Sequence, residues 1–276
     1  MERSDGCVDR PARRRHPLRN MQDSTLEQLK RIGDPVHVSQ GEVIFREGDP
    51  CGSVYVLCSG RVKLSATSRE GRTLILKIAR SGAALGLIAA LTNQIYEVTA
   101  ETVGPCRLRK IRRQLLLDFL DSSTDAGIRT AIAIAQEYKT ALSAVQRLAL
   151  TVTASGRVAG LLLEWSREQK AGNSSHAWFP MPLTHGEIGS MTATCRETVT
   201  RVLGQFQRDQ VISIRGGSLT VLQPVALEQI AVQHHHRDGQ PRIPPHISSS
   251  PAISKSRASS RVSMAGESGT PANDAE

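Results

Sequence analysis

The stretch that decides the fold is LTHGEIGSMTATCRETVTRVLGQFQRDQVISIRGGSLTVL, residues 183–222. Thr184, with Glu187 three residues later, matches a capping box and predicts the start of a helix. The short linker TATC leads into a second amphipathic segment, and two apolar runs then flank Gly216 and Gly217, which predicts a β-hairpin. Helix, tight turn, helix and hairpin is the order of a winged helix-turn-helix.

The second helix of this motif, expected over residues 195–206, has two faces of opposite character at the helical period. The apolar face carries Val199, Val202, Leu203 and Phe206. The polar face carries Arg196, Glu197 and Arg201. An arginine donates two hydrogen bonds to guanine, and a glutamate accepts one from the amino group of cytosine. We therefore expect these three side chains to read base edges in the major groove of double-stranded DNA.

Other polar residues around this helix are expected to contact DNA phosphates, which sets the register but carries little sequence information. They are Thr184, His185, Thr194, Thr200, Arg208, Arg215 and Ser218. Two purely structural roles for Glu197 stay open as alternatives. It fits a capping box with Thr194, and it stands at the i, i+4 spacing of a surface ion pair with Arg201.

An enzyme with Cys195 as the nucleophile is another interpretation of this stretch. A catalytic thiol needs a base, such as His185 or His176, and a third residue that orients the base. No such Cys–His–Asp order can be placed on the predicted elements, so we expect no catalytic activity. Redox control of DNA binding through Cys195 stays open, because a helix N-terminus lowers the pKa of a thiol.

Residues 36–111 have the pattern of short antiparallel strands. Apolar and polar positions alternate, and Gly or Asp interrupts them every few residues. The strongest strand patterns are Ser53–Leu57, Arg61–Ser65 and Thr73–Ile78, and EVTAETVGPCRLRKI adds two more candidates. Such a series predicts an antiparallel sandwich or roll.

Residues 124–153 change to a helical period, with apolar residues at alternating steps of three and four. We expect this seam to join two copies in a symmetric dimer. The seam contains Ile134, Tyr138, Ala141, Val145, Leu148 and Val152. A second apolar stripe on an adjacent face contains Ile128, Ile132, Ala135, Leu142 and Ala149. A single helix buried within a monomer is the alternative.

The composition favours an anionic partner. The 276 residues carry a formal net charge of +9 and a pI of about 9.8, which suits nucleic acid or a membrane surface. Aromatic residues make up 3%, which argues against base stacking on aromatic platforms. The longest apolar run, residues 83–91, is too short to cross a bilayer, and residues 1–20 lack the apolar core of a secretory signal. We expect a cytoplasmic protein without a membrane segment.

Metal and disulfide chemistry is not predicted. The five cysteines are scattered and form no C-x-x-C pair, so reduced thiols are expected. Three adjacent histidines, His234, His235 and His236, stand in a tail rich in Ser and Pro that cannot bury enough apolar surface to fold. We expect no metal there.

Residues 183–222 resemble the DNA-binding domain of the Crp/Fnr superfamily of bacterial transcription regulators, through the elements E-I-G, R-E-T-V and R-V-L. The upstream stretches GEVIFREGD, SVYVLCSGRVKLS and GRTLILKIARSG resemble the cyclic-nucleotide-binding type of roll in that family. The resemblance covers about residues 23–224. It implies an α+β fold with an N-terminal antiparallel β-roll (a jelly roll or double-stranded β-helix), a long dimerisation helix and a C-terminal winged helix-turn-helix.

Resemblance and composition together predict five segments. They are a disordered basic arm over 1–22, a roll-shaped sensor domain over 23–122, the dimerisation helix over 123–153, the winged helix-turn-helix over 154–224 and a disordered tail over 225–276. The resemblance also implies RNA polymerase as a partner. Arg196, Glu197 and Arg201 match the positions that read a half-site with a GTGA core in members of the cyclic-AMP-receptor type.

The sensor pocket departs from that family pattern. Members that bind cyclic nucleotides have Glu after the glycine matched by Gly86 and Arg near the position of Glu97, whereas Leu87 follows the glycine here. The degenerate pocket comprises Gly86, Leu87, Glu97, Val98, Leu142 and Ser143. Because a carboxylate repels a cyclic phosphate and leucine cannot hold a ribose, we expect that cyclic AMP does not bind.

Other cofactors are weighed by their ligands. An iron–sulfur cluster needs four thiolates, and only Cys7 lies near the N-terminus, so no cluster is expected. Haem or another small effector stays open, since His37, Cys51, Cys58 and Cys106 lie in the roll. The alternative function is a degenerate cyclic-nucleotide-type module that acts as a regulatory protein-interaction domain.

Overall fold

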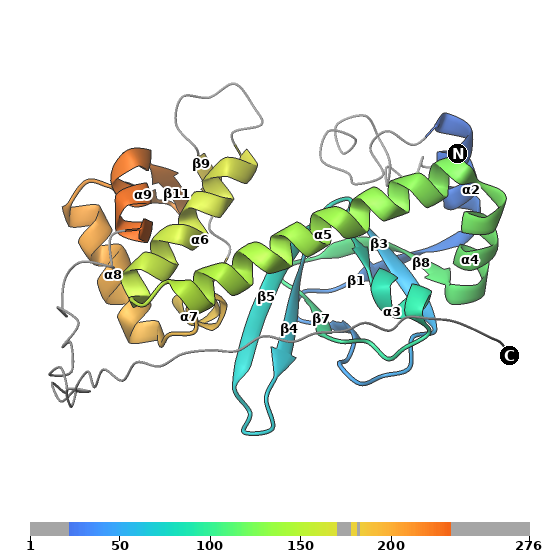
Figure 1. Ribbon diagram of the computed structural model, residues 1–276, viewed down its shortest axis with the longest axis horizontal. Helices are drawn as coiled ribbons and strands as arrows, with labels where there is room; N and C mark the ends of the chain where they lie inside the picture. Colours follow the sequence, from blue (N-terminus) through green and yellow to red (C-terminus); the bar gives the residue numbers. More distant parts are fainter. Residues whose placement is uncertain (1–21, 170–177, 181–182, 233–276) are drawn as a thin grey trace, which may run out of the picture. The chain divides into compact units, whose positions relative to one another are not determined.

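The computed structural model describes residues 22–169, 178–180 and 183–232. It contains two antiparallel four-stranded sheets, a long helix and a second domain of helices and a small sheet, in that order along the chain (Figure 1). The α+β class and the order of its parts are therefore confirmed. Predictions for the basic arm before Gln22, for the tail after Val232 and for His234, His235 and His236 lie outside the described residues.

The N-terminal sheets form the predicted roll. Its strands are β1 (Gly33–Val38), β2 (Val43–Phe45), β3 (Ser53–Ser59), β4 (Arg61–Thr67), β5 (Thr73–Arg80), β6 (Ala84–Leu85), β7 (Thr99–Thr102) and β8 (Cys106–Arg112). One sheet has the order β1-β8-β3-β6 and the other β2-β7-β4-β5, with antiparallel neighbours throughout. The three strongest predicted strands are confirmed as β3, β4 and β5, each two residues longer than expected.

Side chains from both sheets share one core. Leu57, Val62 and Leu108 are almost fully buried in it, each from a different strand. The phenol of Tyr96 donates a hydrogen bond of 2.6 Å to the carbonyl of Ser53, and its ring stacks on Phe45 with centroids 3.9 Å apart. Burial raises the pKa of Tyr96, which keeps this phenol protonated as a donor. The stacked rings of Tyr96 and Phe45 lie in the core of the roll, next to the chain segment of the predicted pocket.

Four helices accompany the roll: α2 (Asp23–Arg31), α3 (Leu87–Thr92), α4 (Arg113–Ser122) and α5 (Thr124–Leu150). Apolar residues of all four contact β3 and β8 in a second core, which includes Leu26, Leu87, Phe119 and Ala126. The side chain of Ser123 caps α5 by accepting from the amide of Ala126. Figure 1 shows α5 as one unbroken helix of 27 residues that runs from α4 along the roll to the next helix.

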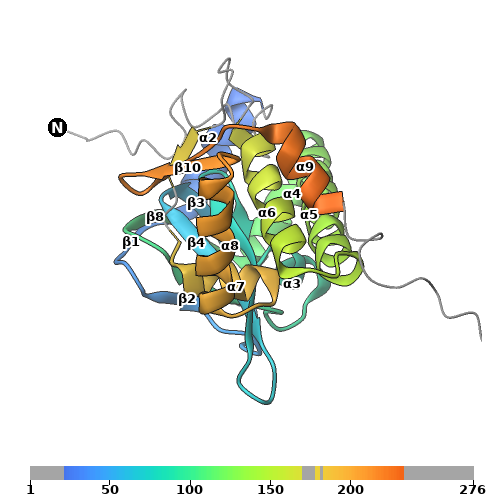
Figure 2. The same cartoon turned by 90° about the vertical axis from the view of Figure 1, so that its left-hand side faces the viewer.

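The C-terminal domain contains α6 (Ala154–Gln169), β9 (Trp178–Pro180), α7 (His185–Thr192), α8 (Arg196–Arg208), β10 (Ile212–Arg215), β11 (Ser218–Val221) and α9 (Pro224–Val232). Figure 2 shows α7 next to α8 and α9 next to α6. The predicted hairpin is confirmed as β10 and β11, and its turn places Gly216 and Gly217 at φ of 55° and 75°. Its core contains Val158, Leu162, Ile188, Leu203 and Leu219.

The folded domain extends beyond its predicted end at residue 224. Helix α9 continues to Val232, so the expectation of a disordered tail from 225 is wrong for its first eight residues. Pro224 suits the first turn of a helix, and Leu227 is fully buried in the core of the domain. The helix was missed because seven of its nine residues are apolar, and its two polar residues, Glu228 and Gln229, are adjacent and mark no helical period. Strand β9 was also missed, since its three residues are a strand only through pairing with β11.

Leu227→Ala should therefore destabilise the protein. Leu227 is 0% exposed, and truncation of a buried leucine costs about 2–5 kcal/mol. Val225→Ala in the same helix is the control, because Val225 is 67% exposed and its truncation should cost about 0.5 kcal/mol or less. Urea unfolding followed by circular dichroism measures both, and equal midpoints for the two variants would show that α9 does not pack on the domain.

Candidate functional site

The turn between α7 and α8 fixes the angle of the helix-turn-helix. Ala193 ends α7 in the left-handed region at φ 48°, and the amide of Thr194 donates to the carbonyl of Gly189 at 3.0 Å. A β-carbon added at Gly189 would lie 2.7 Å from the carbonyl oxygen of Thr194, closer than real contacts allow. Only glycine lets the two helices meet here, which explains the E-I-G element of the sequence.

The start of α7 is held to α8 by side-chain hydrogen bonds. The predicted capping box is confirmed: the amide of Glu187 donates to the Thr184 hydroxyl at 3.2 Å, and the amide of Thr184 donates to the Glu187 carboxylate at 2.9 Å. The ring Nδ1 of His185 lies 2.8 Å from the Thr200 hydroxyl on α8. Thr184, His185 and Thr200, all predicted phosphate contacts, therefore lie together at one edge of the motif.

The predicted base-reading residues share one exposed face of α8. Val199 and Leu203 are buried against the domain on the opposite face. Arg196, Glu197 and Arg201 are exposed, and none of them forms an ion pair with another of the described residues. The i, i+4 ion pair considered for Glu197 is thus not formed among the described residues.

The local partners of Glu197 differ from the capping box considered for it. The N-cap of α8 is Cys195 rather than Thr194, and Cys195 makes no capping hydrogen bond. A hydrogen bond from the amide of Glu197 itself, and one from the Cys195 thiol, hold the pKa of the Glu197 carboxyl below its usual range. The carboxylate is therefore an acceptor at neutral pH. Cys195 is an exposed free thiol 3.1 Å from the Thr198 hydroxyl.

The remaining predicted phosphate contacts lie on the edges of the same domain. Thr194 is half-buried in the turn, and Arg208 lies exposed in the last turn of α8, where it donates to Gln205 at 2.7 Å. Arg215 and Ser218 flank the tip of the β10–β11 hairpin, the wing of the motif. The turn, helix α8 and the β10–β11 hairpin thus all present polar side chains to solvent.

One residue that supports the motif was missed from the sequence. The guanidinium of Arg157 on α6 donates to the carbonyls of Thr192 at 2.8 Å, Val152 at 3.0 Å and Thr151 at 3.1 Å. Thr151 and Val152 follow α5, and Thr192 ends α7, so a single side chain ties the end of the long helix to the helix-turn-helix. A lone arginine in a helix gives no sequence signal of such a role.

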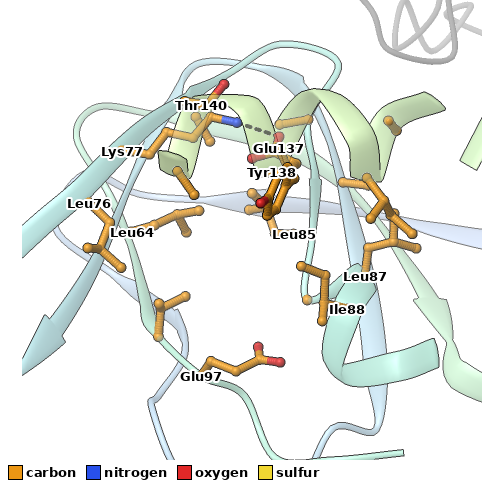
Figure 3. A pocket seen from close by; sticks show the side chains of 18 of the residues that line it. Leu64, Leu76, Lys77, Leu85, Leu87, Ile88, Glu97, Glu137, Tyr138 and Thr140 are labelled. Atoms are coloured by element: carbon orange, nitrogen blue, oxygen red, sulfur yellow. Dashed lines mark hydrogen bonds and ion pairs between the residues drawn. The ribbon is translucent and has the colours of Figure 1, made fainter. Parts of the chain in front are cut away.

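The roll and α5 enclose a cavity of about 430 Å³ (Figure 3). Of the six residues in the predicted degenerate pocket, Gly86, Leu87, Glu97 and Val98 line it. Leu142 and Ser143 do not line it and are exposed, so the prediction that they face the pocket is wrong. Thr140 and Ala141, two residues earlier on α5, line the cavity instead.

Three charged side chains line the cavity. They are Lys77, Glu137 and Glu97. Lys77 on β5 pairs with Glu137 on α5, so its charge is already neutralised. Figure 3 shows this pair at one end of the cavity and the Glu97 carboxylate at the other. The cavity thus presents a paired lysine, a paired glutamate and a second carboxylate among apolar side chains.

The residues of the predicted dimer seam divide between three environments. Tyr138 is 68% and Val145 60% exposed, and Val152 lies exposed beyond the end of α5. Ile134 packs against the core of α2, α3 and α4, Ala141 lines the cavity, and Leu148 is half-buried. The exposed apolar face of α5 combines members of both predicted stripes. It contains Ile128, Ile132, Tyr138, Leu142 and Val145.

Within the described ranges, no group of three or more His, Cys, Asp or Glu side chains is close enough to hold a metal ion. Among the described helices, none is long and apolar enough to cross a membrane.

Comparison with known proteins agrees with this geometry. Residues 35–123 match the cyclic nucleotide-binding domain, and residues 156–230 match the Crp-like helix-turn-helix domain. A sensor-type roll followed by a helix-turn-helix defines a class of two-domain transcription regulators rather than enzymes. The chain belongs to the Crp/Fnr family of transcription regulators.

The similar proteins cover most of the chain. A global nitrogen regulator from Synechococcus elongatus is 26% identical over 75% of this chain and 97% of its own length. The transcriptional activator anr from Pseudomonas aeruginosa is 27% identical over 75% of this chain and 83% of its own. Among solved structures, a Crp/Fnr-family transcriptional regulator from Thermus thermophilus has 27% identity and a TM-score of 0.53, over 72% of this chain and 98% of its own. FixK2 from Bradyrhizobium japonicum, at 22% identity and a TM-score of 0.64 over 72% and 97%, shares the fold.

The tight turn gives a test of the motif. Gly189→Ala should open the angle between α7 and α8 and weaken DNA binding, because its β-carbon meets a backbone carbonyl that cannot move aside. The matched control is Gly186→Ala in the same helix, whose β-carbon would meet only the Thr184 hydroxyl at an ordinary 3.8 Å. Thermal unfolding and DNA titration of both variants provide the measurement. Equal stability and affinity in the two variants would contradict the role given to Gly189.

Proposed function

We propose that the protein binds an inverted-repeat DNA site as a homodimer, with helix α8 of each copy in the major groove. The observation that carries this proposal is the face of α8 on which Arg196, Glu197 and Arg201 are exposed without ion pairs to other described residues. Arginine and glutamate are the side chains that recognise guanine and cytosine edges. Their match to base-reading positions of cyclic-AMP-receptor-type members supports a half-site with a GTGA core.

The homodimer rests on the apolar face of α5. Ile128, Ile132, Leu142 and Val145 are large, exposed and on one side of a helix of 27 residues. An apolar face of this length in contact with water favours association, and a second copy of the same helix presents the same surface. Two copies would place two recognition helices on one side of the duplex, about one helical turn apart.

Three further parts of the proposal follow from this role. A regulator bound to DNA acts where the bacterial chromosome lies, in the cytoplasm, and RNA polymerase is the partner that the family implies. Cyclic AMP is not expected to change DNA affinity, because Glu97 and Leu87 line the cavity where phosphate and ribose would bind. The second candidate, a regulatory protein-interaction module, is disfavoured by the open polar face of α8, which such a module does not need.

The base-reading residues are tested by single substitutions. Arg196→Ala, Glu197→Ala and Arg201→Ala should each relax the preference at one base pair, by about 1–3 kcal/mol of discrimination. Arg167→Ala is the charge-matched control, since Arg167 is an exposed arginine on α6 that pairs with Glu228. Selection from randomised DNA, followed by affinity measurement at fixed salt, reports each preference.

Selection of a motif without inverted symmetry would contradict the dimeric reading of a repeat. A uniform loss of affinity for all sequences in the three variants would show that these residues contact phosphates only. Failure to retain any duplex at low salt would favour the protein-interaction module.

The dimer is tested on α5. Leu142→Glu places a carboxylate in the exposed apolar face and should convert dimers to monomers. DNA affinity should then fall by about 100-fold or more, because the two half-sites no longer act together. Gln136→Glu adds the same charge to an exposed position of α5 outside that face and should change neither property. Analytical ultracentrifugation decides the matter, and a monomeric unsubstituted protein would refute the proposal.

A further inference from the structure

The cavity between the roll and α5 has the size and lining of a binding site for a small organic molecule. Its volume of about 430 Å³ lies within the range of ligand pockets in proteins. Its large aliphatic lining residues on the side of the roll are Leu64, Leu76, Leu85, Leu87 and Ile88, from β4, β5, β6 and α3. Such a lining gains from contact with apolar matter and offers little to a sugar or a phosphate.

Large apolar side chains at the edge of the cavity remain in contact with water. Leu76 is 39% and Ile88 47% exposed, although both line the same space. Figure 3 shows them on opposite sides of it, with Tyr138 of α5 directed inwards. A bound apolar molecule would cover both Leu76 and Ile88. Without a ligand these side chains leave apolar surface in water, which binding would bury.

Charge decides which apolar molecules fit. The Lys77–Glu137 ion pair leaves Glu97 as the one lining carboxylate without an ion pair in the described part of the chain. An anionic group in the cavity would lose its water and also face Glu97. A neutral group loses less hydration free energy, and an ammonium group is attracted by the carboxylate of Glu97.

We infer that this cavity binds an apolar small molecule that is neutral or carries one amine, and that it excludes anions such as nucleotides and carboxylates. The binding itself does not depend on the proposed DNA function; only its consequence for DNA does. Ile134, Glu137, Tyr138 and Ala141 of α5 all line the cavity. A ligand therefore touches the helix that carries the dimer face and leads to the helix-turn-helix.

The experiment uses the full-length protein without DNA and the neutral apolar dye N-phenyl-1-naphthylamine, whose fluorescence increases in apolar sites. Three competitors of equal length then displace it: 4-phenylbutylamine, 4-phenylbutanol and 4-phenylbutyrate. We expect saturable dye binding and competition in the order amine, alcohol, carboxylate. The carboxylate should be weaker than the alcohol by about tenfold or more, because it loses its hydration beside Glu97. Cyclic AMP should not compete.

Two substitutions test whether the dye binds in this cavity. Ala141→Trp fills the cavity from an exposed position of α5 and should abolish dye binding. Gln136→Trp introduces the same ring at an exposed position of α5 that does not line the cavity, and should leave dye binding unchanged. Glu97→Gln, a conservative change at an exposed position, should move the amine below the alcohol and leave the alcohol unchanged.

Each contrary result overturns the inference. Absence of saturable dye binding, or equal binding by Ala141→Trp and the unsubstituted protein, shows that the cavity is not the site. Stronger competition by 4-phenylbutyrate or cyclic AMP than by the alcohol shows that the ligand class is wrong. A protein that binds the dye but no DNA would refute the proposed function and leave this inference standing, and the reverse pattern would separate them equally well.

Discussion

Helix α5 presents three different apolar surfaces at once. Ala126 and Ile134 of α5 pack against the core of the roll, Tyr138 and Ala141 line the cavity, and the face around Leu142 is exposed. Rotation of α5 by even part of a turn would change all three surfaces together, since they share one rigid helix. The roll core fixes that rotation, so the shape of the cavity and the composition of the exposed face follow from it.

The same helix is joined to the DNA-binding domain by charged side chains. Arg147 of α5 is buried and pairs with Glu164 of α6, and Arg157 of α6 holds the residues after α5 to the end of α7. Such contacts have few alternative arrangements, because an arginine with several carbonyl partners loses all of them when it moves. Contacts of α5, α6 and α7 therefore connect the long helix with the turn before α8.

Much of the fold could be predicted because its signals are local. The capping box at Thr184, the hairpin at Gly216 and the two faces of α8 each depend on neighbours within a few residues. The orientation of α5 could not be predicted, since two adjacent apolar stripes fit a seam equally well and only packing on the roll separates them. Leu142 and Ser143 were assigned to the pocket through the family resemblance, whereas packing of α5 on the roll brings Thr140 and Ala141 to it. Helix α9 was missed because burial of Leu227, not periodicity, stabilises it.

Within the helix-turn-helix, different residues hold the structure and face the solvent, and this has a consequence for how such a protein evolves. Gly189, Val199 and Leu203 hold the geometry of the motif, whereas Arg196 and Arg201 have no ion pair with other described residues that substitution would break. Exchanges at exposed positions of this kind usually alter folding stability by only about 0.5 kcal/mol. Under the proposed function, single substitutions at Arg196 or Arg201 would therefore change the DNA preference without loss of the folded state, and drift at these positions after gene duplication would give two regulators with separate sets of targets.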